Sequence, residues 1–168
     1  MEPLVPADVD LRDFGFMPLD VRRLLTSETW IEAADEPKVG HAAMCLWAES
    51  WHQVPAASLP DNDRVLARLA MCDAREWKSL KDKIMAGWVK CSDGLLYHPV
   101  VAEKALDSWK AKCARRARTR AATEAREARK RDENPDRHVQ RDVERNEQRD
   151  VARNEDRNVH QGTGTGIG

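Results

Sequence analysis

The chain has 168 residues, 34% of them charged, and a formal net charge of −1. This length suits one folded domain with extensions, and so high a charge content argues against a chain that is globular throughout. The opening sequence is acidic and lacks an apolar run, and no stretch approaches the roughly 20 apolar residues that span a bilayer. We therefore expect a soluble, cytoplasmic protein with neither a secretory signal nor a membrane anchor.

The charges are distributed unevenly along the chain. Residues 1–103 carry 11 Lys and Arg against 17 Asp and Glu, whereas residues 104–131 carry 11 against 3. The last segment, 132–168, carries 6 against 9. The near-neutral total thus conceals an acidic body and a basic stretch, an arrangement that suits contact with an anionic partner.

Aromatic side chains are confined to the first 109 residues of the sequence, and the cysteines to the first 113. All six Trp, the single Tyr and both Phe lie at or before Trp109, enough to build one core of about 100 residues. The four cysteines (Cys45, Cys72, Cys91 and Cys113) form no CxxC pair, and no His lies at zinc-ligand spacing from them. We expect free thiols, no metal site and no cofactor.

The N-terminal part of the chain has weak signals. We expect residues 1–13 to form a loose leader. Phe14 and Phe16 alternate with smaller or polar neighbours, which is typical of a short strand. The sequence LDVRRLLTSETW predicts a short helix that ends near Ser27, and the acidic segment 31–38 is expected to be a loop.

Two helices are predicted from stronger patterns. Residues 39–53 show an apolar stripe at three- and four-residue steps that includes Trp47 and Trp51. A second helix is expected after Asp61, which follows a proline and is a good N-cap residue. This second helix is expected to end near Cys72.

A third helix and a hairpin follow directly. Asp73 and Glu76 have the spacing of a capping box, which predicts the start of a helix. Gly87 is expected to end that helix. Two short runs, 88–91 and 95–98, then flank an Asp-Gly pair. Asp-Gly between such runs is a strong hairpin signal.

The last part of the chain has high helix propensity and then low complexity. Pro99 suits the first turn of a long helix, whose Ala- and Arg-rich stretch 104–131 offers no apolar face beyond Cys113. Segment 132–168 repeats a unit of eight residues with about one Val each, too little apolar area to fold. We expect it to be a disordered tail.

The order of the elements predicts a fold class. Three helices followed at once by a hairpin is the order of a winged helix, so residues 14–103 are expected to be a mainly α winged-helix domain with a small β-hairpin. In such domains the third helix can enter the major groove of DNA while the hairpin reaches phosphates. The basic helix and the tail would follow this domain.

The candidate nucleic-acid contacts are basic and hydroxyl side chains on the outward face of the third helix, on the hairpin and on the basic helix. They are Arg75, Lys78, Ser79, Lys83, Lys90 and Ser92 in the domain, and Arg115, Arg116, Arg118 and Arg120 in the basic helix. Such residues could contact phosphates, with a pronounced dependence on salt. The alternatives are an ordinary solvated amphipathic third helix and a solvated single helix that links domain and tail.

The sequence also resembles a family. The stretches LPDNDRVLARLA, EWKSL and GWVKCSDGLLYHPVVAEKA, followed by a charged Ala/Arg helix, resemble the YdaU-like proteins of phages and prophages, a domain of unknown function. That family is similar to the winged-helix N-terminal domains of phage replication initiators and DnaD-type helicase loaders. The resemblance implies a role near phage or prophage DNA replication, with DNA and a replicative helicase or another replication protein as partners. It supplies no catalytic residues, and the acidic segment before residue 39 departs from its pattern.

Catalytic motifs are missing from the sequence. It has neither a glycine-rich phosphate loop nor a GxSxG motif, and the carboxylates Asp61 and Asp63 are better explained by helix capping than by acid–base chemistry. We expect a protein that is not an enzyme and has no small-molecule substrate. Two hypotheses remain: a DNA-binding accessory protein of replication, and an adaptor whose body docks another protein without contacting DNA.

Overall fold

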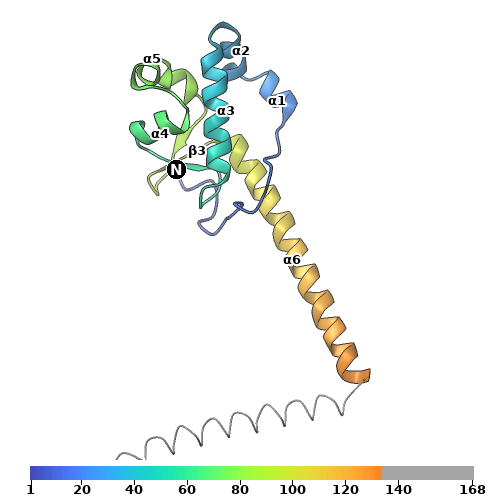
Figure 1. Ribbon diagram of the computed structural model, residues 1–168. Helices are drawn as coiled ribbons and strands as arrows, with labels where there is room; N and C mark the ends of the chain where they lie inside the picture. Colours follow the sequence, from blue (N-terminus) through green and yellow to red (C-terminus); the bar gives the residue numbers. More distant parts are fainter. Residues whose placement is uncertain (134–168) are drawn as a thin grey trace, which may run out of the picture. The chain divides into compact units, whose positions relative to one another are not determined.

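The computed structural model describes residues 1–133, which are mainly helical with a small antiparallel sheet (Figure 1). The helices are α1 (Val21–Leu25), α2 (Glu28–Asp35), α3 (Pro37–Trp51), α4 (Asp63–Leu69), α5 (Ala74–Ile84) and α6 (Pro99–Glu133). The strands are β1 (Ser58–Pro60), β2 (Val89–Lys90) and β3 (Leu95–Tyr97). The chain divides into two units, the first of which is Met1–Arg115. Among the described helices, none is both long enough and apolar enough to cross a bilayer.

The three strands form an antiparallel sheet in the order β1-β3-β2. Leu96 in the central strand pairs with Leu59 of β1 on one side and with Lys90 of β2 on the other. The predicted hairpin between β2 and β3 is confirmed, with Gly94 at a φ of 82° in its turn. Strand β1 was not predicted, because three residues ending in a proline give no periodic signal.

Helix α3 lies at the centre of the first unit and separates two apolar cores (Figure 1). Ala43, Trp47 and Trp51, spaced four apart on one face, pack in the first core with Tyr97 and the start of α6. The neighbouring face, which includes Leu46, packs in the second core against α4, α5 and the sheet. Helix α3 confirms the helix predicted over residues 39–53. Its apolar stripe is conspicuous in the sequence because the helix is buried on two faces.

The prediction of a loose leader at residues 1–13 is wrong. Val5, Val9 and Leu11 are at most 1% exposed and belong to the first core. The Val9 carbonyl also accepts a hydrogen bond from the amide of Ala56 at 2.9 Å. The three side chains are too scattered in sequence to form a helical or strand pattern, so only the folded core shows why they are apolar.

The segment between the leader and α3 also differs from prediction. Phe14 lies in a turn-rich stretch without a strand and packs its ring against Trp51, 6.5 Å away between centroids. The expected loop at 31–38 is instead helical over most of its length, because Ser27 caps α2 by accepting from the amide of Trp30. A Cβ on Gly40 would lie 2.7 Å from the Cβ of Ala33, so glycine lets α2 pack closely on α3.

Helix caps account for the boundaries of α4 and α5. The capping box of Asp73 and Glu76 is confirmed, with both reciprocal hydrogen bonds present at the start of α5. The N-cap of α4 is Asn62 and not the predicted Asp61: the Asn62 side chain accepts from two backbone amides. Asp61 instead forms an ion pair with Lys90, 2.7 Å away. The predicted tail lies outside the described residues, except that α6 extends to Glu133.

Candidate nucleic-acid interface

Helix α5 presents one apolar and one polar face. Trp77 and Ile84 are buried in the second core, which fixes the rotation of the helix. The predicted contacts Arg75, Lys78 and Ser79 are consequently exposed to solvent. The hydroxyl of Ser79 donates a hydrogen bond to the backbone carbonyl of Glu76 at 3.0 Å, and its oxygen can still accept from a ligand.

Two predicted basic contacts are held by carboxylates of neighbouring elements. Lys83, near the end of α5, lies 2.5 Å from the carboxylate of Glu32 in α2, and Lys90 of β2 pairs with Asp61. The side-chain hydrogen bond to Glu32 raises the pKa of Lys83. These pairs are solvent-exposed and weak, but they cancel the charge of two of the six predicted contacts in the body.

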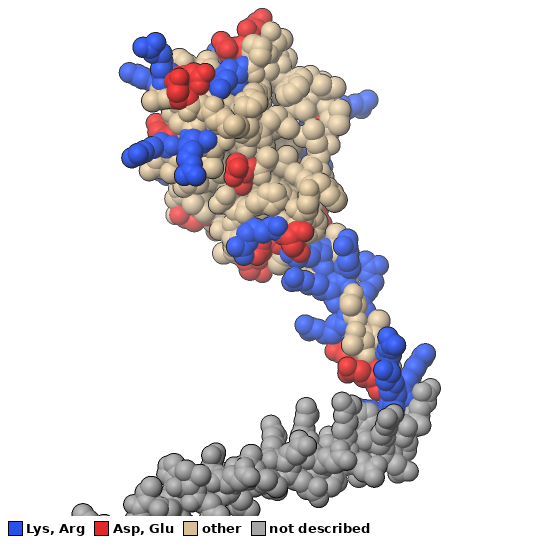
Figure 2. Space-filling view, in the orientation of Figure 1, with Lys and Arg blue, Asp and Glu red and all other residues tan. Residues whose placement is uncertain are grey.

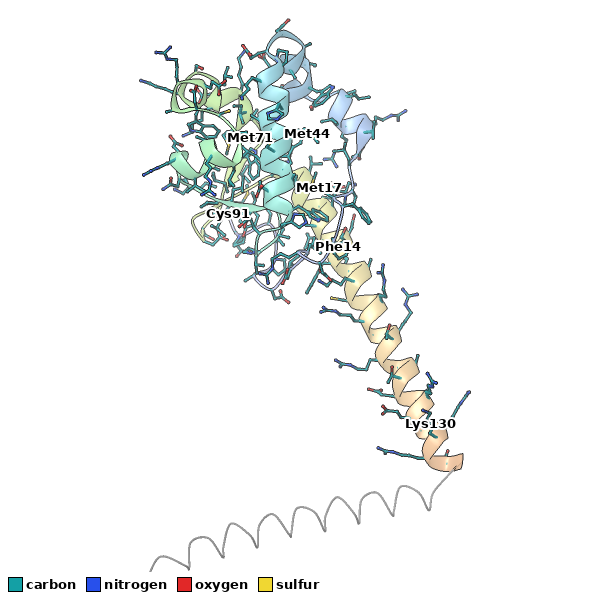
Figure 3. The ribbon with its side chains drawn as sticks, viewed as in Figure 1. Phe14, Met17, Met44, Met71, Cys91 and Lys130 are labelled. Atoms are coloured by element: carbon teal, nitrogen blue, oxygen red, sulfur yellow. The ribbon has the colours of Figure 1, made fainter. Side chains whose placement is uncertain are left out.

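Helix α4 carries two basic side chains that the sequence analysis did not assign to a site. Arg64 and Arg68 are four residues apart and exposed, since Leu66 and Ala67 turn the opposite side of α4 into the core. Figure 2 shows Lys and Arg side chains over the α4–α5 region of this view. The turn between the two helices adds Met71, which is 64% exposed and has a positive φ of 54° (Figure 3). The sequence does not show that α4 lies beside α5; this is a feature of the tertiary structure.

The four basic residues of α4 and α5 differ from the others in the body. Within the described part of the chain, no ion pair forms to Arg64, Arg68, Arg75 or Lys78, whereas most other cations of residues 1–103 are paired. Lys81 of α5, for example, lies 2.6 Å from Asp63. We call these four residues the α4–α5 basic face. Their unneutralised charge attracts an anionic ligand.

The side chain of Asp93 stabilises the hairpin through two hydrogen bonds. One carboxylate oxygen accepts from the amide of Leu95 at 3.0 Å, and the other accepts from the hydroxyl of Tyr97 at 2.7 Å. Burial and this hydrogen bond raise the pKa of Tyr97 far above its usual range. The predicted contact Ser92 is exposed, and its amide donates to the carbonyl of Met1 at 2.8 Å. The turn is therefore tied to the N-terminus of the chain.

Helix α6 changes character along its length. Lys112 is buried: its ammonium donates to the carbonyl of Asp10 at 2.7 Å and to the carboxylate of Asp13, while lying over the rings of Phe14 and Trp109. The predicted contacts Arg115, Arg116, Arg118 and Arg120 are all exposed. Every described residue from Cys113 onwards is exposed, and Lys130 marks the last turns of the helix (Figure 3).

A buried histidine lies beside the start of α6. The His98 ring packs between Trp47 and Trp88, with centroids 5.3 and 5.5 Å away. Burial, with a smaller contribution from Arg23, lowers the pKa of His98 to about 4. Its Nδ1 atom has no hydrogen-bond partner among the described residues. These features make His98 a neutral component of the core at physiological pH, away from the α4–α5 basic face.

The described residues contain no group of three or more His, Cys, Asp or Glu placed to hold a metal ion. The four cysteines are free thiols, and burial raises the pKa of the Cys72 thiol. This part of the chain thus consists of a compact helical body with a three-stranded sheet and an exposed basic helix.

Sequence comparison identifies the family of this body. Residues 15–107 match the family described as "Protein of unknown function (DUF1376)", and the chain belongs to that family. The match begins beside Phe14 and ends in the first turns of α6, so it covers the helices α1–α5 and the sheet. No curated protein and no solved structure matches the chain.

Proposed function

We propose that this protein binds nucleic acid without catalysing a reaction, through a winged-helix body and the basic second half of α6. The order α3, β1, α4, α5, β2, β3 and the sheet order β1-β3-β2 support the winged-helix assignment. In this assignment α5 has the position of the helix that enters the major groove, and the turn between β2 and β3 is the wing.

The α4–α5 basic face is the observation that carries the proposal. An acidic body would repel phosphate, but three carboxylates on or beside these helices are engaged with other cations of the body: Asp61 with Lys90, Asp63 with Lys81 and Glu32 with Lys83. The cations of the α4–α5 basic face are left for phosphates. A helix pair that combines Arg and Lys in this way can contact the backbone of a duplex on both sides of a groove.

The second half of α6 supports the same class of partner by a different route. Its basic side chains are exposed all around the helix and have no core to bury against. Such a helix binds polyanions electrostatically, with little sequence preference and strong dependence on salt. We propose that it increases affinity, and that α5 and the wing provide what sequence discrimination there is.

The resemblance to YdaU-like proteins supports a role in phage or prophage replication, with a replicative helicase or another replication protein as the second partner. The adaptor alternative, in which the body docks a protein and does not contact DNA, is supported by the net acidity of residues 1–103. Binding measurements on the body's own cations separate the two functions.

The test is fluorescence anisotropy of labelled single- and double-stranded DNA, titrated with full-length protein at several salt concentrations. In one variant, Arg75→Gln and Lys78→Gln remove two unpaired charges; in its matched control, Lys83→Gln and Lys90→Gln remove two paired ones. A plot of log affinity against log salt falls with a slope of about −0.9 for each phosphate contact. We therefore expect the first variant to make this slope less steep by about 2. The control is expected to change the slope by much less.

A third variant addresses the basic helix. Arg116→Ala and Arg120→Ala keep helix propensity high while removing two charges from α6. A slope lowered by this variant alone would assign DNA contact to α6 and support the adaptor function for the body. Wild-type protein that binds neither form of DNA at low salt would contradict the proposal.

A further inference from the structure

Large apolar side chains are exposed in one short part of the chain. Phe16, Leu19, Val21, Leu25 and Ile31 are between 42% and 70% exposed, and they make up five of the nine large exposed hydrophobic residues of the described chain. We call these five residues the apolar strip. In Figure 2 the surface over α1 is largely uncharged, with a basic side chain at its edge, whereas charged side chains lie over α2. Large apolar side chains that are exposed together within residues 16–31 are typical of an interaction site.

A cavity adjoins the apolar strip. It has a volume of about 90 Å³ and is lined by Met17, Leu19 and Leu24 from the strip's own segment and by Trp47, His98 and Val101 from the core. Met17 is labelled in Figure 3, beside the start of α6. The lining is mainly apolar, and its volume suits one inserted aliphatic side chain. The same segment therefore offers both projecting apolar side chains and a hollow that could receive one.

The exposed charges beside the apolar strip differ in sign between its two helices. Arg22 lies on α1, is exposed and forms no ion pair with any described residue. On α2, the exposed carboxylates of Glu28 and Asp35 lie three residues before and four residues after Ile31, on the same helical face. A partner that matches this surface needs apolar side chains, an acidic group opposite Arg22 and a basic group opposite α2.

A second copy of this chain satisfies all three requirements. In a two-fold symmetric interface the same surface meets itself in reverse, so α1 of one copy, with Arg22, faces the carboxylates on α2 of the other, and each hollow faces the partner's projecting side chains. We propose that the apolar strip is the contact surface of a symmetric homodimer. The dimer would also bring two α4–α5 basic faces into one assembly, although this inference does not depend on DNA binding.

The first test is sedimentation velocity of the full-length protein over a range of concentrations, without nucleic acid. We expect a monomer–dimer equilibrium in the wild type and at least a 100-fold weaker dimer when Leu25→Glu and Ile31→Lys are combined. The matched control combines Val65→Glu and Met71→Lys, two exposed apolar positions near the α4–α5 basic face, and is expected to dimerise like the wild type. Circular dichroism of each variant verifies that the body remains folded.

A charge exchange tests the two-fold arrangement itself. Arg22→Glu and Asp35→Arg are each expected to weaken the dimer, because like charges then meet across the interface, and the double variant is expected to restore it. A wild type that stays monomeric at millimolar concentration would overturn the proposal. So would a dimer unaffected by Leu25→Glu with Ile31→Lys, or a charge exchange without restoration. DNA binding is measured separately, so failure of the dimer leaves the proposed function unaffected.

Discussion

The body and the second half of α6 both contain many basic residues but present them in different ways. In residues 1–103, six of the eleven cations form ion pairs, for example Arg23 with Glu103 at 2.7 Å. Between Arg116 and Arg131, all seven Lys and Arg side chains are exposed, in a part of α6 that has no buried residue. A count of charges therefore overstates the positive surface of the body, because folding brings carboxylates from other elements against its lysines and arginines.

The largest expected effect is a loss of stability that a core substitution causes in the body and that a substitution in the second half of α6 does not cause. Leu11 is fully buried in the first core, although it belongs to the segment predicted to be a loose leader. We expect Leu11→Ala to lower the free energy of unfolding by about 3 kcal/mol, the cost of lost burial and of the cavity left behind. Urea denaturation followed by tryptophan fluorescence measures this change.

The matched control lies in α6. Arg120 is exposed, and alanine favours a helix at least as well as arginine, so Arg120→Ala is expected to change the free energy of unfolding by less than about 0.5 kcal/mol. Equal effects of the two substitutions would show that the leader does not contribute to the core.

A second prediction concerns how the stability of the body depends on pH. Because the pKa of His98 falls from 6.5 to about 4 in the folded protein, the unfolded chain takes up a proton first as the pH is lowered. Stability is therefore fully present above the unfolded pKa and is lost as the pH falls from about 6.5 towards 4. Between pH 7.5 and 5 we expect a loss of about 2 kcal/mol. Urea denaturation at both pH values should show it.

The control for this prediction is His98→Gln, which cannot titrate in this range. Its free energy of unfolding is expected to vary less between pH 7.5 and 5 than that of the wild type, whatever its absolute value. A variant with the same pH dependence as the wild type would show that His98 is not the group responsible.

The smallest expected effect concerns the ion pairs that neutralise the body. The pair between Lys83 and Glu32 joins α5 to α2, and both side chains are nearly half exposed. A double-mutant cycle with Lys83→Gln and Glu32→Gln is expected to give a coupling energy below about 1 kcal/mol. A coupling of several kcal/mol would contradict this expectation and would mean that the pair contributes strongly to the packing of α5 on α2.

Local signals in the sequence determined a large part of this fold. The stripe that includes Trp47 and Trp51 predicted α3, and the spacing of Asp73 and Glu76 predicted the start of α5. The Asp-Gly pair before Leu95 predicted the hairpin. In each case the hydrogen bonds or the periodic face lie within a few residues, so neighbouring side chains contain the necessary information.

Other features were decided only by contacts between distant segments. Val5 and Val9 are buried because α3 and α6 create a core for them, and the segment around Ile31 is helical because Ser27 caps it and Gly40 lets it pack on α3. The strand predicted at Phe14 is replaced by a turn, and the Phe14 ring packs on Trp51.

The candidate site shows the same division. The sequence alone determined that Arg75 and Lys78 lie opposite the buried side of α5, because helical periodicity places them away from Trp77. Only the tertiary structure decided that Lys83 meets Glu32, 51 residues away, and that α4, with its two arginines, packs beside α5. Periodicity fixes which side of a helix faces water, but the electrostatic environment of that side depends on which other elements pack next to it.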